Sequence, residues 1–201
     1  PLHPDSYLLS VDAYSYGYNK DLASKILSDA GFKDVDDDNV LEDEDGNKLS
    51  LRLITNPSNK ARMLVSQLIQ GYLNDIGIDL ILDFDTQYIK DFSPEEESAI
   101  WEDFSARVDR GDYDIVLLGW KSSVIPNLFP AFHSSMIDQG SNFINYSNEE
   151  MDQLLVDTLL DKSRNQKIDI YANLQEYIIE DLPYVSLYFE NIGLLVDSKI
   201  Q

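Results

Sequence analysis

The chain has 201 residues and a formal net charge of -22, because 37 acidic residues are balanced by only 15 lysines and arginines. A surface this acidic repels nucleic-acid phosphates and anionic membranes, which argues against both as partners. There is no cysteine, so disulfides, thiolate metal sites and a cysteine nucleophile are excluded.

No stretch approaches the roughly 18 apolar residues that a membrane-spanning helix needs, and no signal peptide is recognisable. Residues 1–4 form a proline-bounded coil that is typical of the interior of a longer protein. We therefore expect a fragment.

The first third of the chain predicts a helix followed by an acidic loop. Residues 1–19 are expected to be coil. A helix is expected over residues 21–30, ended by Gly31, because apolar residues recur at helical spacing: Leu22, Ile26 and Ala30. Residues 34–45 form the acidic loop, and a turn is predicted at residues 45–47.

The next segment predicts a strand, a helix and a second strand. Residues 49–53 and 78–84 alternate apolar and polar side chains, as strands do. The helix between them is expected to end at Gly77 and to bury the face formed by Ala61, Leu64, Leu68, Tyr72 and Ile76. This βαβ pattern implies parallel pairing of the two strands.

A helix over residues 99–110 is expected to lead into the segment Gly111–Trp120, where a buried strand is predicted at residues 115–118. In α/β sheets, ligands bind beyond the carboxyl ends of strands. Trp120 therefore either packs in the core or lines a ligand cleft. The long segment 120–145 is predicted to be a functional loop with a short helical turn near residues 128–132.

The last third predicts two helices and two strands. Residues 147–150 form a capping box, with Tyr146 and Met151 as a hydrophobic staple. The second helix spans residues 166–181 and ends before a proline. Strands are predicted at residues 184–188 and 193–196.

Catalytic residues are scarce. The only histidines are His3 and His133, and no G-x-S-x-G, H-E-x-x-H, Walker A or G-x-G-x-x-G sequence occurs. A hydrolase would have to use His133 with Ser134 or Ser135, and neighbours in sequence seldom form a triad. We expect no enzyme, and keep a His133 hydrolase as an alternative.

The acidic loop has the spacing of a calcium loop. Counted from its first aspartate, carboxylates occupy positions 1, 3, 5, 9 and 12: Asp34, Asp36, Asp38, Glu42 and Asp45. Position 6 is Asn39 in place of glycine, and asparagine tolerates the left-handed conformation. The loop is either a solvated acidic turn or a structural calcium site, and no other cofactor is expected. An acidic calcium-binding adhesion domain is the alternative function.

Five collinear motifs resemble those of family 5 extracellular solute-binding proteins, the oligopeptide and dipeptide receptors of ABC importers. Tyr18 to Phe32 is similar to their "Y-(D/N)-x-x-x-A-x-x-L-L-x-x-A-G-(F/Y/W)", and the acidic loop to "D-x-D-x-D-G-V-L-E". Gln70 to Ile78 resembles "I-Q-x-x-L-x-x-I-G-I", and Gly111 to Trp120 resembles "G-D-Y-D-(…)-G-W". Residues 132–152 resemble "F-H-S-S … N-(…)-Y-S-N-x-E-x-D".

The resemblance implies an α/β fold, a type II periplasmic-binding-protein-like lobe with a mixed, mostly parallel sheet flanked by helices. Residues 1–201 would be the single C-terminal lobe of a two-lobe receptor. Residues 1–19 would enter from the N-terminal lobe, and residues 184–201 would lead back towards it. The receptor would capture peptides or a related solute outside the cytoplasm, anchored by a lipid, and deliver them to a membrane permease.

The resemblance also places ligand contacts in the loop after Gly119. The expected contacts are Trp120, Ser122, Ser123, Asn127 and Asn142. Many relatives hold the ligand's amino terminus with an aspartate between this tryptophan and a proline, and residues 121–126 contain no carboxylate. Ser123, Asn127 or a residue of the other lobe could take that role. The ligand could equally be a modified peptide or no peptide.

Overall fold

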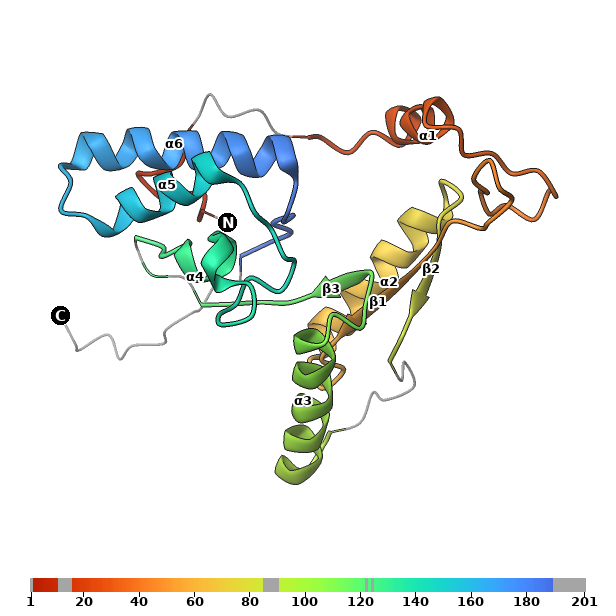
Figure 1. The fold of residues 1–201 in the computed structure, drawn as a ribbon. Coiled ribbons are helices and arrows are strands. Elements are labelled where there is room, and N and C mark those ends of the chain that lie inside the picture. Colours follow the sequence, from red (N-terminus) through yellow and green to blue (C-terminus); the bar gives the residue numbers. More distant parts are fainter. Residues whose placement is uncertain (1, 11–15, 85–90, 122, 124, 190–201) are drawn as a thin grey trace, which may run out of the picture. The chain divides into compact units, whose positions relative to one another are not determined.

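The structure, a computed structural model, describes residues 2–10, 16–84, 91–121, 123 and 125–189. The chain divides into two compact units (Figure 1). The sheet unit comprises residues 16–121, and the helical unit comprises residues 1–15 and 122–201. The single lobe expected over residues 1–201 stays a prediction.

The sheet unit alternates helices and strands. Its elements are α1 (Lys20–Asp29), β1 (Ser50–Thr55), α2 (Lys60–Asn74), β2 (Asp79–Leu82), α3 (Pro94–Asp109) and β3 (Ile115–Leu117). The strands form one parallel sheet in the order β2-β1-β3. The predicted parallel βαβ unit is therefore confirmed, with Leu53 of β1 paired to Leu82 on one side and to Ile115 on the other.

The helix α2 covers the sheet with a different face from the one predicted. Its Val65, Ile69 and Leu73 pack against the buried core residues Leu53, Leu80 and Leu117. Three residues of the predicted face are instead more than half exposed: Leu64 at 61%, Leu68 at 59% and Tyr72 at 55%. The helix carries two apolar stripes, and the sheet selects the one that contains the buried Ser66, whose hydroxyl donates to the Arg62 carbonyl at 2.9 Å.

Capping side chains set the helix starts. The helix α3 begins at Pro94, ahead of the predicted Ala99, because Ser93 and Glu96 form a capping box. A second box, formed by Ser163 and Gln166, starts α6 (Arg164–Asp181). For α5 (Glu149–Leu159), the predicted box led by Ser147 is wrong, because the N-cap is the neighbouring Asn148, whose side chain accepts the Met151 N–H.

The helical unit consists of α4 (Phe129–Phe132), the 3₁₀ helix η1 (Ser134–Met136), α5 and α6, and α4 confirms the predicted helical turn. Its core includes Phe132, Met151, Leu155, Tyr171 and Leu174. The start of the chain joins this core through Leu2 and Leu8. The side chain of Gln175 on α6 accepts the Ser10 N–H at 3.2 Å and donates to the Leu8 carbonyl at 3.1 Å.

The strand predicted at residues 184–188 is wrong. These residues have no regular secondary structure and form no strand ladder with any described residue. The ring of Tyr184 packs edge-on against Phe132 at 6.1 Å, while Val185, Leu187 and Tyr188 are exposed. An apolar run becomes a strand only where a partner strand takes its backbone hydrogen bonds. The strand predicted at residues 193–196 lies outside the described residues.

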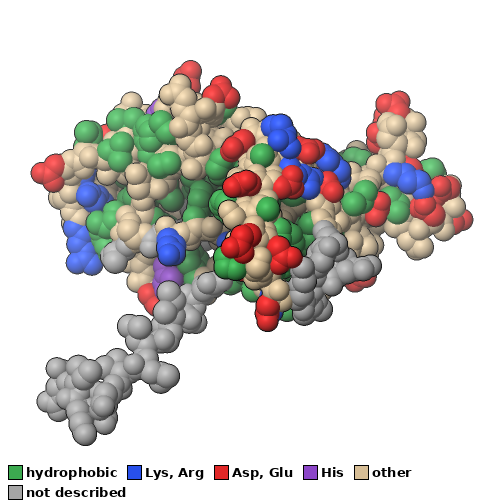
Figure 2. Space-filling view, turned by 90° about the horizontal axis from the view of Figure 1, so that it is seen from below, with side chains coloured by type: hydrophobic (Ala, Val, Ile, Leu, Met, Phe, Trp, Pro, Cys, Tyr) green, Lys and Arg blue, Asp and Glu red, His purple; other side chains and the backbone are tan. Residues whose placement is uncertain are grey.

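Surface acidity is widespread rather than confined to the loop. Figure 2 shows carboxylates scattered over the visible face, among apolar and basic side chains. Within the described part of the chain, no helix has both the length and the hydropathy needed to cross a bilayer.

Candidate functional site

The carboxyl ends of β1 and β3 lie side by side, as parallel pairing requires. Thr55 ends β1 opposite Leu117, which ends β3. The buried Thr55 hydroxyl donates to the Leu117 carbonyl at 2.8 Å and joins the two strand ends. The segments that follow, Asn56 onward and Leu118 onward, therefore leave the sheet from one edge.

Trp120 follows β3 at this edge and is 45% exposed. It is therefore not a core residue, and its place in a ligand cleft stays a prediction. The preceding Gly119 matters because a Cβ atom there would lie 2.8 Å from Nη2 of Arg62. Glycine thus lets a guanidinium lie directly against the backbone beside Trp120.

Arg62 comes from the first turn of α2, whose N-cap Asn59 accepts the Arg62 N–H at 3.0 Å. Its guanidinium forms no ion pair or hydrogen bond with any side chain in the ranges that the structure describes. The sequence prediction missed Arg62. The available signal was a capping asparagine, Asn59, only four residues after the end of β1, because so short a connection keeps the first turn of α2 near the carboxyl edge of the sheet.

The acids of the Gly111–Trp120 segment have a structural role at the start of β3. Asp114 accepts the Arg52 backbone N–H at 2.7 Å, and Asp112 accepts from the Arg52 guanidinium at 3.0 Å. Arg107 adds a second cation, 3.5 Å from Asp112. The hydrogen bond from Arg52 lowers the pKa of the Asp112 carboxyl, and the positive charges of Arg52 and Arg107 lower it further.

The other predicted ligand contacts belong to the helical unit. Ser122 lies outside the described residues. Ser123 is exposed and its hydroxyl donates to the Ile125 carbonyl. Asn127 is also exposed, and its side-chain oxygen accepts the Phe129 N–H at 3.1 Å, just before α4. Their contact with a ligand stays a prediction.

Asn142 has a different environment, because it is only 3% exposed. Its side-chain amide donates to the carbonyls of His133 at 3.1 Å and Tyr146 at 2.8 Å. Its oxygen accepts the Tyr146 N–H at 3.0 Å. Both donors are used within the fold, so the geometry gives Asn142 the role of holding the loop together.

His133 does not form a catalytic triad. The Ser135 hydroxyl lies 2.9 Å from Nδ1 of His133, and the nearest oxygen of Asp152 lies 3.8 Å from the same nitrogen. A triad needs the serine and the acid on opposite ring nitrogens. Asp152 instead accepts the Ser134 N–H at 2.9 Å, which ties η1 to α5.

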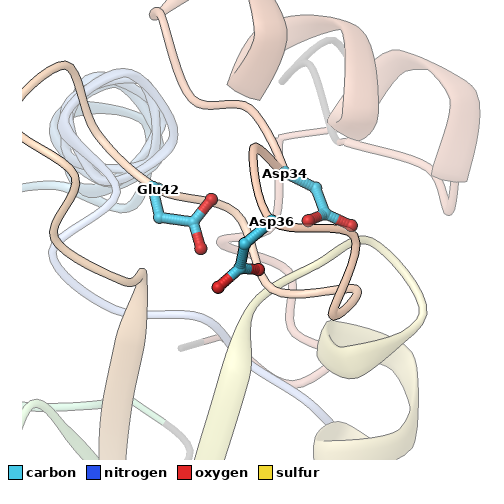
Figure 3. A group of neighbouring side chains, drawn as sticks. All are labelled: Asp34, Asp36 and Glu42. Carbon is cyan, nitrogen blue, oxygen red and sulfur yellow. The ribbon is translucent and has the colours of Figure 1, made fainter.

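The acidic loop gathers part of the predicted metal set. Carboxylate oxygens of Asp34, Asp36 and Glu42 lie within 4.8 Å of one another (Figure 3). Asp38 is outside this group and pairs with Lys48, whose hydrogen bond lowers the pKa of that carboxyl. Asp45 lies in the following turn, where its N–H donates to Asp43 at 3.0 Å. Asn39 adopts the left-handed conformation that asparagine tolerates, with φ 69°.

Comparisons with known proteins identify the family. Residues 1–140 match the family described as bacterial extracellular solute-binding proteins, family 5 middle. The oligopeptide-binding protein AppA of Bacillus subtilis (strain 168) is 34% identical over 196 residues, which cover 98% of this chain and 34% of AppA. The chain thus spans about a third of the length of this relative.

Solved structures agree. The AppA structure in complex with a nonapeptide matches 92% of this chain and 34% of its own, with a TM-score of 0.74 and 31% identity. The oligopeptide-binding protein of Thermus thermophilus with a pentapeptide matches 90% of this chain and 31% of its own, with a TM-score of 0.70 and 18% identity. The expected α/β fold of type II periplasmic binding proteins is confirmed, and the chain belongs to the family 5 bacterial extracellular solute-binding proteins.

Proposed function

We propose that this chain is the C-terminal lobe of a two-lobe receptor that captures peptides outside the cytoplasm for an ABC importer. Family membership supports the proposal, as does the similarity to an AppA structure that holds a nonapeptide. The N-terminal lobe, a lipid anchor and a membrane permease complete the proposed system. The relatives are binding proteins, and the receptor acts by enclosing its ligand without chemistry.

The observation that carries the proposal is the half-exposed Trp120 at the carboxyl edge of the sheet, beside Arg62. The indole offers a flat apolar face to a peptide side chain. The Arg62 guanidinium suits a carboxylate or backbone carbonyl of the ligand, since it presents several fixed N–H donors. Ser123 and Asn127 are the further proposed contacts.

A carboxylate for the ligand's amino terminus does not come from residues 121–126. If neither Ser123, Asn127 nor the N-terminal lobe holds that terminus, a peptide with a blocked amino terminus should bind as well as a free one, within about threefold. Adhesion, the alternative derived from the acidic loop, gains no support from the relatives, which bind solutes.

The two tryptophans provide a matched test, because Trp101 on α3 is 50% exposed and Trp120 is 45% exposed. Calorimetry on the full-length protein that contains these residues would measure nonapeptide binding. Trp120→Ala is expected to weaken binding about 10–100-fold, as loss of an aromatic anchor does. Trp101→Ala should change it less than about twofold. Equal losses in both variants would contradict the proposed site.

A further inference from the structure

We propose that the loop between α1 and β1 binds a calcium-type divalent cation through Asp34, Asp36 and Glu42. The site is separate from peptide capture and does not depend on it. Three observations lead to this assignment. A buried carboxylate oxygen of Glu42 has no hydrogen-bond donor among the described residues, the three carboxylates lie close together, and the ammonium group of Lys48 is too far from that oxygen to form a hydrogen bond with it.

Glu42 is the first observation, since a buried carboxylate normally has a hydrogen-bond donor for each oxygen. Its side chain is only 3% exposed. One oxygen, Oε2, accepts the Val35 N–H at 2.9 Å. The other, Oε1, is buried and has no hydrogen-bond partner among the described residues. A bound cation would be the missing partner of this oxygen.

The position of Glu42 is fixed by its backbone. Its N–H donates to the Lys33 carbonyl at 2.8 Å, and its carbonyl accepts the Lys33 N–H at 3.0 Å. A second bridge pairs Glu42 with Lys48. Figure 3 shows its carboxylate turned towards Asp36. The carboxylate of Glu42 is thus held in place and directed at Asp36.

The second observation is the spacing of the three carboxylates, which lie within 4.8 Å of one another. Calcium takes oxygen ligands at about 2.3–2.6 Å, so one ion can reach oxygens separated by about twice that length. Three carboxylates without nitrogen or sulfur ligands suit a hard cation. Backbone carbonyls and water would complete the coordination.

Lys48 is the rival occupant of this site. Its Nζ atom lies 3.3 Å from Asp36 but 3.9 Å from the unpaired Oε1 of Glu42, beyond hydrogen-bond reach. Its side chain is 45% exposed, and it also pairs with Asp38. A single ammonium leaves most of the carboxylate charge uncompensated, and it can swing into solvent when a cation enters.

The test is calcium titration, by calorimetry, of the full-length protein after chelator treatment. One ion is expected to bind with a Kd of about 10⁻⁴–10⁻³ M, the range of extracellular calcium sites. Asp36→Asn and Glu42→Gln should weaken binding at least about tenfold. The matched control is Asp37→Asn in the same loop, whose φ of 61° suits asparagine. It should change the Kd less than about threefold.

The Lys48→Gln variant shows whether the Lys48 ammonium and a calcium ion compete for the three carboxylates. If a cation displaces the ammonium, this variant binds calcium as tightly as the wild type or more tightly. The proposal is overturned if calcium fails to bind at about 10 mM, if Asp37→Asn loses as much affinity as Asp36→Asn, or if Lys48→Gln abolishes binding. Should Glu42→Gln fail to fold, the exposed Asp36 variant decides the question by itself.

Discussion

Replacing Asn142 with alanine is expected to destabilise the helical unit and leave peptide affinity unchanged. The substitution removes three hydrogen bonds of a buried side chain, at 3.1, 2.8 and 3.0 Å. Each such bond contributes about 0.5–1.5 kcal/mol net, so the free energy of unfolding should fall by about 2–4 kcal/mol. The upper part of this range applies because the Tyr146 N–H and two carbonyls lose their buried partner.

Asn127→Ala is the matched control, because Asn127 was also predicted to contact ligand. It is exposed and accepts one hydrogen bond, from the Phe129 N–H. Its loss should lower the free energy of unfolding by less than about 1 kcal/mol. Urea titration of the full-length variants measures stability, and calorimetry with a nonapeptide measures affinity.

A scaffold role and a ligand-binding role of Asn142 predict opposite effects of Asn142→Ala on stability and on peptide affinity. If Asn142→Ala unfolds at the wild-type urea concentration but binds peptide at least about tenfold more weakly, the scaffold role is refuted. Asn142 would then be a ligand contact, as the family resemblance implied. A loss of stability with intact affinity supports the role that its hydrogen bonds indicate.

Two further predictions concern the sheet unit. At Gly77, φ is +85° and an added Cβ would lie 2.6 Å from Cγ of Leu41, whereas at Gly111 φ is +66° and the space is open. Gly111→Ala should therefore cost only the left-handed strain of about 1–2 kcal/mol, and Gly77→Ala clearly more, by urea titration; equal losses would rule out the clash. The second concerns pH. Because the folded-state pKa of Asp112 is lowered, its stabilising contribution is present above the ordinary value of about 3.9 and is lost as pH falls through the folded value. The stability difference between wild type and Asp112→Asn should be constant from about pH 7 to pH 5 and shrink below about pH 4, and a difference independent of pH would contradict this.

The elements with local signals were predictable. The alternation in residues 49–53, the glycine after α1 and the helical turn near residue 128 each depend on neighbouring residues, and the structure confirms them. The left-handed conformation of Asn39 is likewise compatible with the local preference of asparagine. Local backbone preferences decide these features, whatever tertiary contacts the rest of the chain makes.

Features that depend on distant partners were not predictable. Periodicity in α2 predicted one apolar face, and only the sheet shows that a second stripe, with Val65, Ile69 and Leu73, packs against the core. Residues 184–188 have a strand-like composition, but a strand needs a hydrogen-bonding neighbour. At the candidate site, Trp120 was proposed from its motif, whereas proposing Arg62 requires knowledge that α2 starts at the edge where β3 ends. The burial of Glu42 likewise follows from bridges to Lys33 and Lys48.

The pairing of Gln175 with the Leu8–Ser10 backbone has a consequence for the order of folding. These contacts join residues 165 and 167 positions apart in sequence. The sheet unit lies between them in the chain, and its local βαβ contacts span shorter separations, so we expect them to form first. Leu2 and Leu8 stay unburied until residues 2–10 meet α6. The helical unit is therefore expected to be the late-folding part of these residues.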